Sequence, residues 1–206
     1  MSGFDPYEWP RRLNLGCGRD KRPGCLNIDF LEGHRPELVA DVRDLSMLPD
    51  GHYEEIVAQD ILEHLPRADA PRALERWASL LEDGGRLVLR VPNLIGLAWV
   101  FTWKQTLEDQ EELVQCLYGT QRYDGDFHQN GYTEWLLRHQ LREVGLGHIT
   151  IEPFDEWLFD VVATKVPPEG DLNLEDCIYM TWGKPSDIAL ASAEGRPLCW
   201  TAPCPA

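Results

Sequence analysis

Short apolar runs with β-strand character alternate with helical patterns along the chain, and this order constrains the fold more than any other feature. The helical stretches repeat apolar residues every three or four positions, whereas the other runs are short and are stopped by Gly, Asp or Pro. Helices are expected at 68–81 and 133–144, and strands at 12–15, 25–28, 38–40, 55–58 and 86–91. Strands separated in this way pair in parallel, so the sequence predicts an α/β fold.

The last two β-prone runs, 148–151 and 157–166, lie too close together for a parallel connection, which needs about a dozen residues. They predict an antiparallel pair, and the fold class is therefore a doubly wound, mainly parallel sheet with a terminal antiparallel strand. Segment 93–130 interrupts the alternation, and we expect it to contain a helix and to form an inserted helical lid. Residues 1–166 are predicted to be one domain, followed by a C-terminal extension, 167–206, without a domain of its own.

Charge and cysteine content narrow the function classes. The 206 residues include 19 Lys and Arg against 35 Asp and Glu, a net charge of −16, which disfavours binding to nucleic acid or to anionic membranes. The longest apolar run, Leu94 to Phe101, is far short of the ~20 residues that span a bilayer. No Cys or His cluster has zinc spacing, so no metal site is predicted, and the six cysteines are interpreted as reduced thiols of a cytoplasmic protein.

Polar or flexible residues stand where four of the expected strands end: Gly16-Cys17-Gly18, Asp29, Asp41 and Gln59-Asp60. Ligands of open α/β sheets bind at the carboxyl ends of the strands. The Gly-x-Gly turn allows close approach of the backbone, Asp29 can accept hydrogen bonds from a ribose diol, and Asp41 can accept from an exocyclic amine. Together these residues predict a nucleoside site.

A dinucleotide cofactor fits this spacing poorly. Lys21 stands where a G-x-G-x-x-G motif has its third glycine, and Asp29 follows Gly18 by only 11 positions instead of about 20. Little room is left for the long helix whose N-terminus would hold a pyrophosphate. The spacing therefore favours a nucleoside cofactor without phosphates over a nicotinamide dinucleotide.

Several segments in order resemble the motifs of class I S-adenosylmethionine-dependent methyltransferases. Leu13 to Gly18 resembles the first motif, and Pro23 to Asp29 resembles a compact bacterial subgroup with an L-G-C-G…P-G…N-x-D opening. The resemblance continues through 40–45, 58–65, 81–87 and 91–93, and covers roughly 12–166. It implies a Rossmann-like methyltransferase fold, methyltransferase activity, and S-adenosyl-L-methionine as the cofactor.

The resemblance also implies which residues contact that cofactor. The methionyl part would meet Gly16, Cys17 and Gly18, the ribose Asp29, the adenine Asp41 and the backbone of Val42, and the sulfonium end Gln59. Two departures stand out: Cys25 replaces a tryptophan of the subgroup, and Asn14 replaces the acid that usually precedes the glycines. With Asn14 at that position, the amino group of the cofactor needs another partner.

Methyl transfer to a hydroxyl or an amine needs a base in addition to alignment of the reactants. The candidate catalytic residues are His128, Asp60 and His64, with Asp126 as a further candidate base. Each also has a plain structural interpretation: Asp60 as a helix cap, His64 as a histidine bonded to backbone, and His128 as part of a turn.

The predicted function is methyl transfer to a small metabolite or glycan precursor, with an oxygen acceptor and His128 as the base. The alternative is a methyltransferase-like cofactor-binding or scaffold protein without turnover. A homodimer, in which the C-terminal extension pairs with a second subunit, is a further possibility that the sequence leaves undecided.

Overall fold

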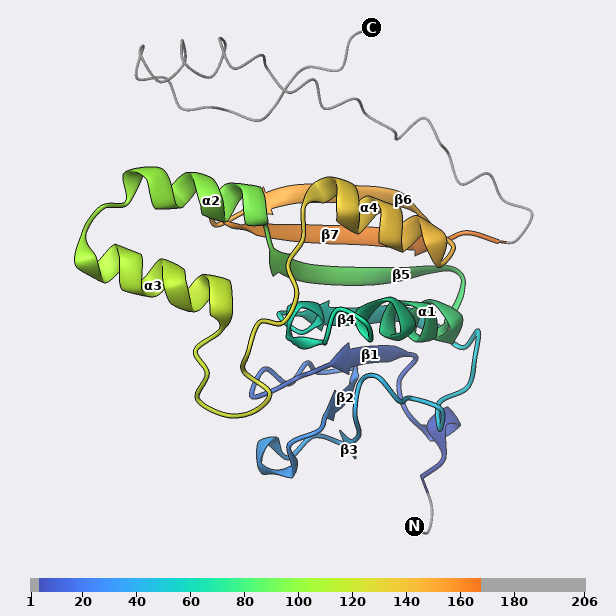
Figure 1. Ribbon diagram of the computed structural model, residues 1–206. Helices are drawn as coiled ribbons and strands as arrows, with labels where there is room; N and C mark the ends of the chain where they lie inside the picture. Colours follow the sequence, from blue (N-terminus) through green and yellow to red (C-terminus); the bar gives the residue numbers. More distant parts are fainter. Residues whose placement is uncertain (1–3, 168–206) are drawn as a thin grey trace, which may run out of the picture. The chain divides into compact units, whose positions relative to one another are not determined.

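The computed structural model describes residues 4–167, which form a seven-stranded sheet in the order β3-β2-β1-β4-β5-β7-β6 (Figure 1). The strands are β1 Arg12–Leu15, β2 Leu26–Asp29, β3 Leu38–Val39, β4 Tyr53–Gln59, β5 Leu81–Pro92, β6 Leu146–Phe154 and β7 Leu158–Lys165. The C-terminal extension that was expected at 167–206 lies outside the described residues from position 168 on, and so do the cysteines at 177, 199 and 204.

Parallel pairing joins β3, β2, β1, β4 and β5. The last strand, β7, lies antiparallel between β5 and β6, and β6 forms the edge of the sheet. The mainly parallel sheet with one antiparallel strand, expected from the short connection between the last two β-prone runs, is therefore confirmed.

Within residues 4–167, four α-helices and three short 3-10 helices accompany the sheet. The helices are α1 Ala70–Leu80, α2 Leu94–Trp103, α3 Leu107–Tyr118 and α4 Glu134–Glu143, with η1 Pro6–Glu8, η2 Glu32–His34 and η3 Leu62–His64. The Thr133 side chain caps α4 by accepting from Leu136 N. No helix among residues 4–167 has both the length and the apolar character that crossing a membrane requires.

The strand expected at 86–91 begins earlier than expected, because the chain turns extended at Leu81, directly after α1, and enters β5 there. A Cβ at Gly85 would lie 2.9 Å from Tyr53 O, so the glycine permits a close approach of β5 to β4. Segment 93–130, which was expected to contain a helix, contains two, α2 and α3, since the apolar run that begins at Leu94 is itself helical.

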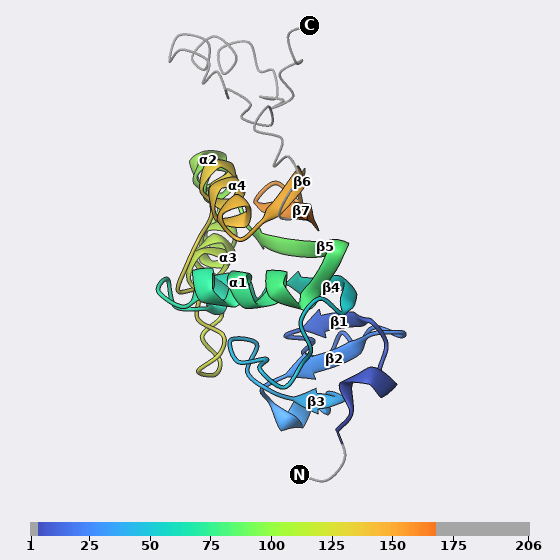
Figure 2. The same ribbon diagram turned by 90° about the vertical axis from the view of Figure 1, so that its right-hand side faces the viewer.

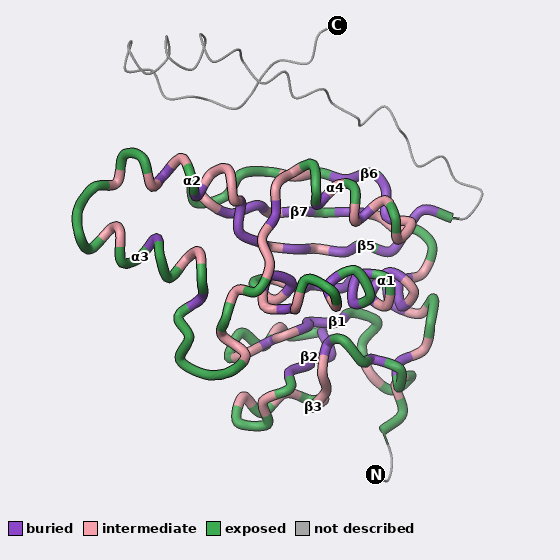
Figure 3. Tube along the Cα trace, in the orientation of Figure 1, coloured by how far each residue is buried: buried purple, intermediate pink, exposed green. Residues whose placement is uncertain are grey.

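The main hydrophobic core lies between one face of the sheet and helices α1 and α4, which Figure 2 shows on the same side. Alternate strand residues such as Leu87 and Leu89 point into this core, and the buried stretches stand out along β4, β5 and α1 in Figure 3. Trp77 of α1 is fully buried, and its Nε1–H donates to the carbonyl of Val42 at 2.9 Å. The core is thereby tied to the segment that follows β3.

The opposite face of the sheet carries polar and charged residues. Glu55 of β4 pairs with Arg12 of β1 and, at 2.6 Å, with Arg86 of β5, while Arg90 of β5 pairs with Asp160 of β7 at 2.8 Å. Within residues 4–167, the connections β1–β2 and β2–β3 contain no α-helix. In β5, Leu87 and Leu89 face the core, while Arg86 and Arg90 lie on the opposite face, so apolar and polar residues alternate along the strand.

The insertion between β5 and α4 leaves the sheet and returns to the same point. Asn93 and Tyr132 form a parallel bridge, and Asn93 also caps α2 through its side chain. Helices α2 and α3 pack on each other around a small core of their own: Leu97, Val100 and Leu113. The two helices project beyond the edge of the sheet where its parallel strands end (Figure 1).

Candidate functional site

Asp29, the last residue of β2, binds the glycine turn that follows β1. Its side chain is 5 % exposed, and it accepts from Gly18 N and from Leu31 N, both at 2.8 Å. His34 Nδ1 lies 3.2 Å from the same carboxylate. A carboxylate has about four acceptor positions, so Asp29 keeps capacity for further donors such as hydroxyls.

Two buried asparagines hold the connection between β1 and β2 in place. Asn14 Nδ2 donates to Asn27 Oδ1 and to the carbonyl of Asp20, both at 2.8 Å, and Asn27 Oδ1 also accepts from Arg22 N. Asn14, which replaces the expected acid, therefore has a structural role that an amide can fill and a carboxylate cannot, because it donates twice.

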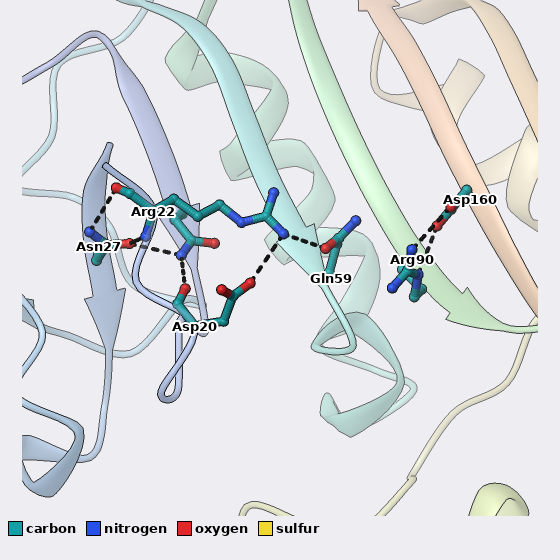
Figure 4. Close-up of polar contacts among 7 residues, drawn as sticks. Asp20, Arg22, Asn27, Gln59, Arg90 and Asp160 are labelled. Atoms are coloured by element: carbon teal, nitrogen blue, oxygen red, sulfur yellow. Dashed lines mark hydrogen bonds and ion pairs between the residues drawn. The ribbon is translucent and has the colours of Figure 1, made fainter. Parts of the chain in front are cut away.

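Arg22 reaches from this connection across to the end of β4, where its Nη2 donates to Oε1 of Gln59 and lies 3.3 Å from Asp20 (Figure 4). The side chain thus links the loop after β1 to the residue expected at the sulfonium end. A guanidinium is a good partner for a carboxylate such as that of a methionyl group. Sequence reasoning missed Arg22, because the contact joins residues 37 positions apart.

Gly16 and Cys17 complete the turn after β1. Gly16 has φ +60°, and a Cβ there would lie 2.4 Å from Ile61 Cδ1, so the turn packs directly on the chain that leaves β4. Burial, followed by the nearby Asp29, raises the pKa of the Cys17 thiol to about 11. The thiol is therefore protonated at neutral pH and poorly nucleophilic.

Gly16→Ala is expected to lower both stability and affinity for S-adenosylhomocysteine. Gly24→Ala is the matched control, because Gly24 has φ +78° in the same connection but open space around its Cβ position. The left-handed backbone should cost about 1–2 kcal/mol in both variants, and the collision with Ile61 only in Gly16→Ala. Thermal unfolding and calorimetric titration measure the two effects; equal losses in both variants would contradict the close packing of Gly16.

The segment after β3 offers a second carboxylate. Asp41 accepts from the Arg43 guanidinium, with Nη2 to Oδ2 at 2.6 Å, and Arg43 also reaches Asp69 at 3.1 Å. The hydrogen bond from Arg43 lowers the pKa of Asp41 below its usual value. Val42, next to it, is buried and held through its carbonyl by Trp77.

The parts of this edge of the sheet fit the cofactor expected from the sequence. Asp29 has acceptor capacity for a ribose diol, and Arg22 can donate to a carboxylate. Both oxygens of Asp41 already accept from Arg43, so an amine would have to share them with that residue. Gly18 has φ +50° and open space at its Cβ position, so a ligand can approach its backbone closely. These residues lie at the ends of β1, β2, β3 and β4, as expected from the strand order.

The structure brings His64 and His128 together, although they are far apart in the sequence. Their rings meet edge to face with centroids 4.8 Å apart. His64 Nδ1 is 3.2 Å from the carbonyl of Phe127, and His128 Nδ1 is 2.9 Å from the carbonyl of Cys116. Burial lowers the pKa of both imidazoles, and the neighbouring His64 lowers that of His128 further.

Glu63, beside His64 in η3, is a buried acid that sequence reasoning missed. It is 1 % exposed, and its Oε2 has no hydrogen-bond partner among the described residues. Burial raises the pKa of Glu63 to about 8, with a smaller contribution from Asp60. The sequence signal was present, as an acid next to a histidine shortly after Gln59, the last residue of β4, but periodicity alone does not show that the side chain of Glu63 turns inward.

Asp60 stands between this group and Gln59. Its backbone has φ +53°, which is rare for a residue other than glycine, and its N–H donates to Arg90 O at 3.0 Å. Burial raises the pKa of its carboxyl. Its side chain makes no capping bond to η3, so the helix-cap interpretation is not observed among the described contacts.

The loop between α3 and α4 connects the histidines to the end of β2. The backbone N–H groups of Gln129 and Asn130 both donate to Glu63 O, at 2.8 and 3.0 Å, which fixes His128 over η3. Earlier in the same loop, a Cβ at Gly125 would lie 2.6 Å from the ring of Phe30, the residue after Asp29. The loop therefore spans from the histidine pair to the end of β2.

Comparison with known proteins identifies the family of the chain. Residues 1–149 match the family model described as a methyltransferase domain, and the chain therefore belongs to the methyltransferase-domain family. This confirms the enzyme class expected from the ordered motifs. No curated protein matches the sequence.

Solved structures share the fold at low sequence identity. A SAM-dependent methyltransferase from Methanosarcina mazei is 18% identical with a TM-score of 0.57, over 75% of this chain and 92% of that one. One from Archaeoglobus fulgidus is 15% identical with a TM-score of 0.55, over 76% and 86%. A protein of Bordetella parapertussis named as a possible exported protein is 17% identical with a TM-score of 0.57, over 77% of this chain and 63% of that one. The Rossmann-like methyltransferase fold is therefore confirmed.

Proposed function

We propose that this protein transfers a methyl group from S-adenosyl-L-methionine to an oxygen of a small molecule, a metabolite or a glycan precursor. The observation that carries the proposal is the contact between His64 and His128. His64 follows β4 and the residues Gln59 and Asp60 at its end, and His128 reaches it from the loop between α3 and α4. The surplus of acidic residues speaks against a nucleic acid as the acceptor.

The residues at the strand ends are assigned to the cofactor. Gly16, Cys17 and Gly18 take the methionyl part, with Arg22 as the partner of its carboxylate, and Asp29 takes the ribose hydroxyls. Asp41 and the Val42 backbone take the adenine. This assignment is supported by the free acceptor positions of Asp29 and by the reach of Arg22 to Gln59.

The bound cofactor supplies an electrophilic methyl group on a sulfonium. The residues of the protein position the acceptor hydroxyl and remove its proton. Because Nδ1 of His128 faces a carbonyl, which can only accept, Nδ1 carries the hydrogen and Nε2 keeps its lone pair. In this proposal Nε2 of His128 takes the hydroxyl proton, and His64 positions the His128 ring. Asp60 lines the same end of β4.

Calorimetric titration of the full chain with S-adenosylhomocysteine tests the cofactor half of the proposal. Binding with a dissociation constant of about 1 μM to 100 μM is expected, because the ligand keeps the adenosine and homocysteine contacts. A folded chain that fails to bind would contradict the proposal and would favour the alternative, a methyltransferase-like scaffold without turnover.

His128→Ala is expected to lower turnover by about 10²–10⁴-fold while leaving affinity for S-adenosylhomocysteine nearly unchanged. The separation is expected because the His128 contacts lie on η3 and α3 rather than on the glycine turn or Asp29. Turnover is measured as S-adenosylhomocysteine release with an acceptor found by screening hydroxylated metabolites. His139→Ala, an exposed histidine of α4, is the control. Full activity of His128→Ala would remove His128 from the reaction.

Further parts of the proposal concern the chain as a whole. Residues 1–166 are assigned to one methyltransferase domain, with residues 93–130 as a lid over the acceptor, and residues 167–206 to an extension that could join a homodimer. Exposed aromatic residues of the insertion, Trp103 and Tyr118, support the lid. The unpaired thiols of Cys17, Cys25 and Cys116 support a reducing, cytoplasmic setting.

A further inference from the structure

Glu63, His64 and His128 form a cluster whose composition is that of a metal-binding site. Each offers one ligand atom, and these atoms all lie within 4.8 Å of one another. Two imidazoles and one carboxylate are a common ligand set for divalent transition metals. The sequence alone did not predict a metal site, because His128 follows His64 by 64 positions and reaches it only through the folded insertion.

Both imidazoles are held in a tautomer that leaves Nε2 available to a metal. The carbonyls of Phe127 and Cys116 face Nδ1 of His64 and of His128, respectively, so each Nδ1 carries the hydrogen and each Nε2 is left with a free lone pair. Metal-binding histidines are typically fixed in this way, by a hydrogen bond from the other ring nitrogen to a backbone carbonyl. The rings are therefore oriented before any ligand binds.

Within the described part of the chain, the buried carboxyl group of Glu63 lacks a hydrogen-bond partner on one of its oxygens. The side chain is 1 % exposed, and Oε2 finds no hydrogen-bond partner among residues 4–167. Leaving a buried carboxyl oxygen unpartnered is costly, and a cation would remove that cost. Two backbone hydrogen bonds to Glu63 O keep this residue and the loop of His128 in a fixed relation.

We propose that Glu63, His64 and His128 bind one divalent transition-metal ion, and that its open coordination positions take the oxygen of the methyl acceptor. This inference rests on the proposed function for the identity of that oxygen, but not for the binding of the ion. An ion that binds a hydroxyl oxygen lowers the pKa of the hydroxyl and fixes its position. With the ion bound, His128 acts as a ligand and no longer as the base. The acceptor hydroxyl, whose pKa the ion lowers, would then give its proton to solvent water, and its oxygen would take the methyl group as the bond from carbon to sulfur breaks.

Cobalt(II) is the probe of choice for the test, since its visible absorption reports the ligands as well as the binding. The full chain, treated with a chelator and dialysed, is titrated with cobalt chloride and, by calorimetry, with zinc chloride. One equivalent is expected to bind, without the strong charge-transfer absorption that thiolate ligands produce. Thiolate absorption, or no binding by the folded chain, would overturn the proposal.

Variants locate the ion. Glu63→Gln and His128→Asn are each expected to weaken cobalt binding at least about tenfold, whereas the exposed His139→Gln on α4 leaves it unchanged. Should Glu63→Gln fail to fold, His128→Asn decides alone, because His128 is only half-buried. Unchanged affinity in His128→Asn would refute the site.

Titration with S-adenosylhomocysteine separates this inference from the proposed function. Binding of S-adenosylhomocysteine without binding of metal refutes the ion and leaves His128 as the base. Metal binding without S-adenosylhomocysteine binding supports the ion but contradicts the proposed cofactor site.

Discussion

Replacing Asp29 with alanine is expected to weaken binding of S-adenosylhomocysteine by at least about tenfold, which corresponds to about 1.4 kcal/mol. Asp29 is the one carboxylate at the end of β2, it is nearly fully buried, and it is the assigned partner of the ribose hydroxyls. Hydrogen bonds to a charged acceptor contribute about 1.5–3 kcal/mol each, so losing two of them leaves little affinity.

The same substitution also removes the acceptor of two backbone N–H groups, those of Gly18 and Leu31. Part of the loss of affinity will therefore come from a loosened glycine turn. Asp29→Asn separates the two causes, because the amide retains one acceptor oxygen at the same place but can no longer accept at both. We expect its affinity to lie between those of wild type and Asp29→Ala.

Asp83→Ala is the matched control. Asp83 is an exposed acid near the start of β5, whereas Asp29 stands where the parallel strand β2 ends. Calorimetry gives the affinities, and thermal unfolding shows that each variant is folded under the conditions of the titration. Wild-type affinity in Asp29→Ala would show that the ribose binds elsewhere.

The location of Asp29 illustrates what the sequence can predict. In a parallel sheet the strand order and direction bring all carboxyl ends to one edge, so the residue after each apolar run is placed without knowledge of any side-chain contact. Asp29, Asp41 and Gln59 were placed in this way. The family motifs supplied their roles, because short polar segments at strand ends have many uses in other folds.

Contacts between distant segments could not be predicted in the same manner. The reach of Arg22 to Gln59 and the approach of His128 to His64 depend on loops whose paths follow from packing rather than from periodicity. The loop of His128 is fixed by backbone N–H groups that donate to Glu63 O, and main-chain hydrogen bonds of this kind leave no mark on residue identity. Asn14 shows the reverse case: the departure from the motif was visible, but its structural cause was not.

The insertion shows why the number of helices was underestimated. Helix α2 is apolar along nearly its whole length, so it lacks the alternation of apolar and polar faces by which helices are recognised. Its partner α3 has such a pattern. An apolar run of this length fits a buried strand or a buried helix equally well, and only the packing of Leu97 and Val100 against Leu113 decides between them.

Trp77→Ala is expected to have the largest effect on stability, a loss of about 3–5 kcal/mol in the free energy of unfolding. Trp77 is among the largest fully buried side chains and lies in the main core beneath the sheet. Chemical denaturation measures the loss. The matched control is Trp135→Ala on α4, because Trp135 is 48% exposed and its removal leaves no cavity; equal losses in the two variants would contradict this account.

Trp77→Phe connects the core to the cofactor site. Phenylalanine keeps one six-membered ring in the core, but the hydrogen bond from Nε1 to the Val42 carbonyl is lost, which leaves a buried acceptor unpartnered at a cost of about 1–3 kcal/mol in addition to the lost packing. Since the backbone of Val42 is the segment assigned to the adenine, this variant should also bind S-adenosylhomocysteine more weakly than Trp135→Ala does. A stability loss without any change in affinity would mean that the adenine does not depend on Val42. The core of this protein would then support the sheet alone, and the assignment of the segment after β3 to the cofactor would have to be abandoned.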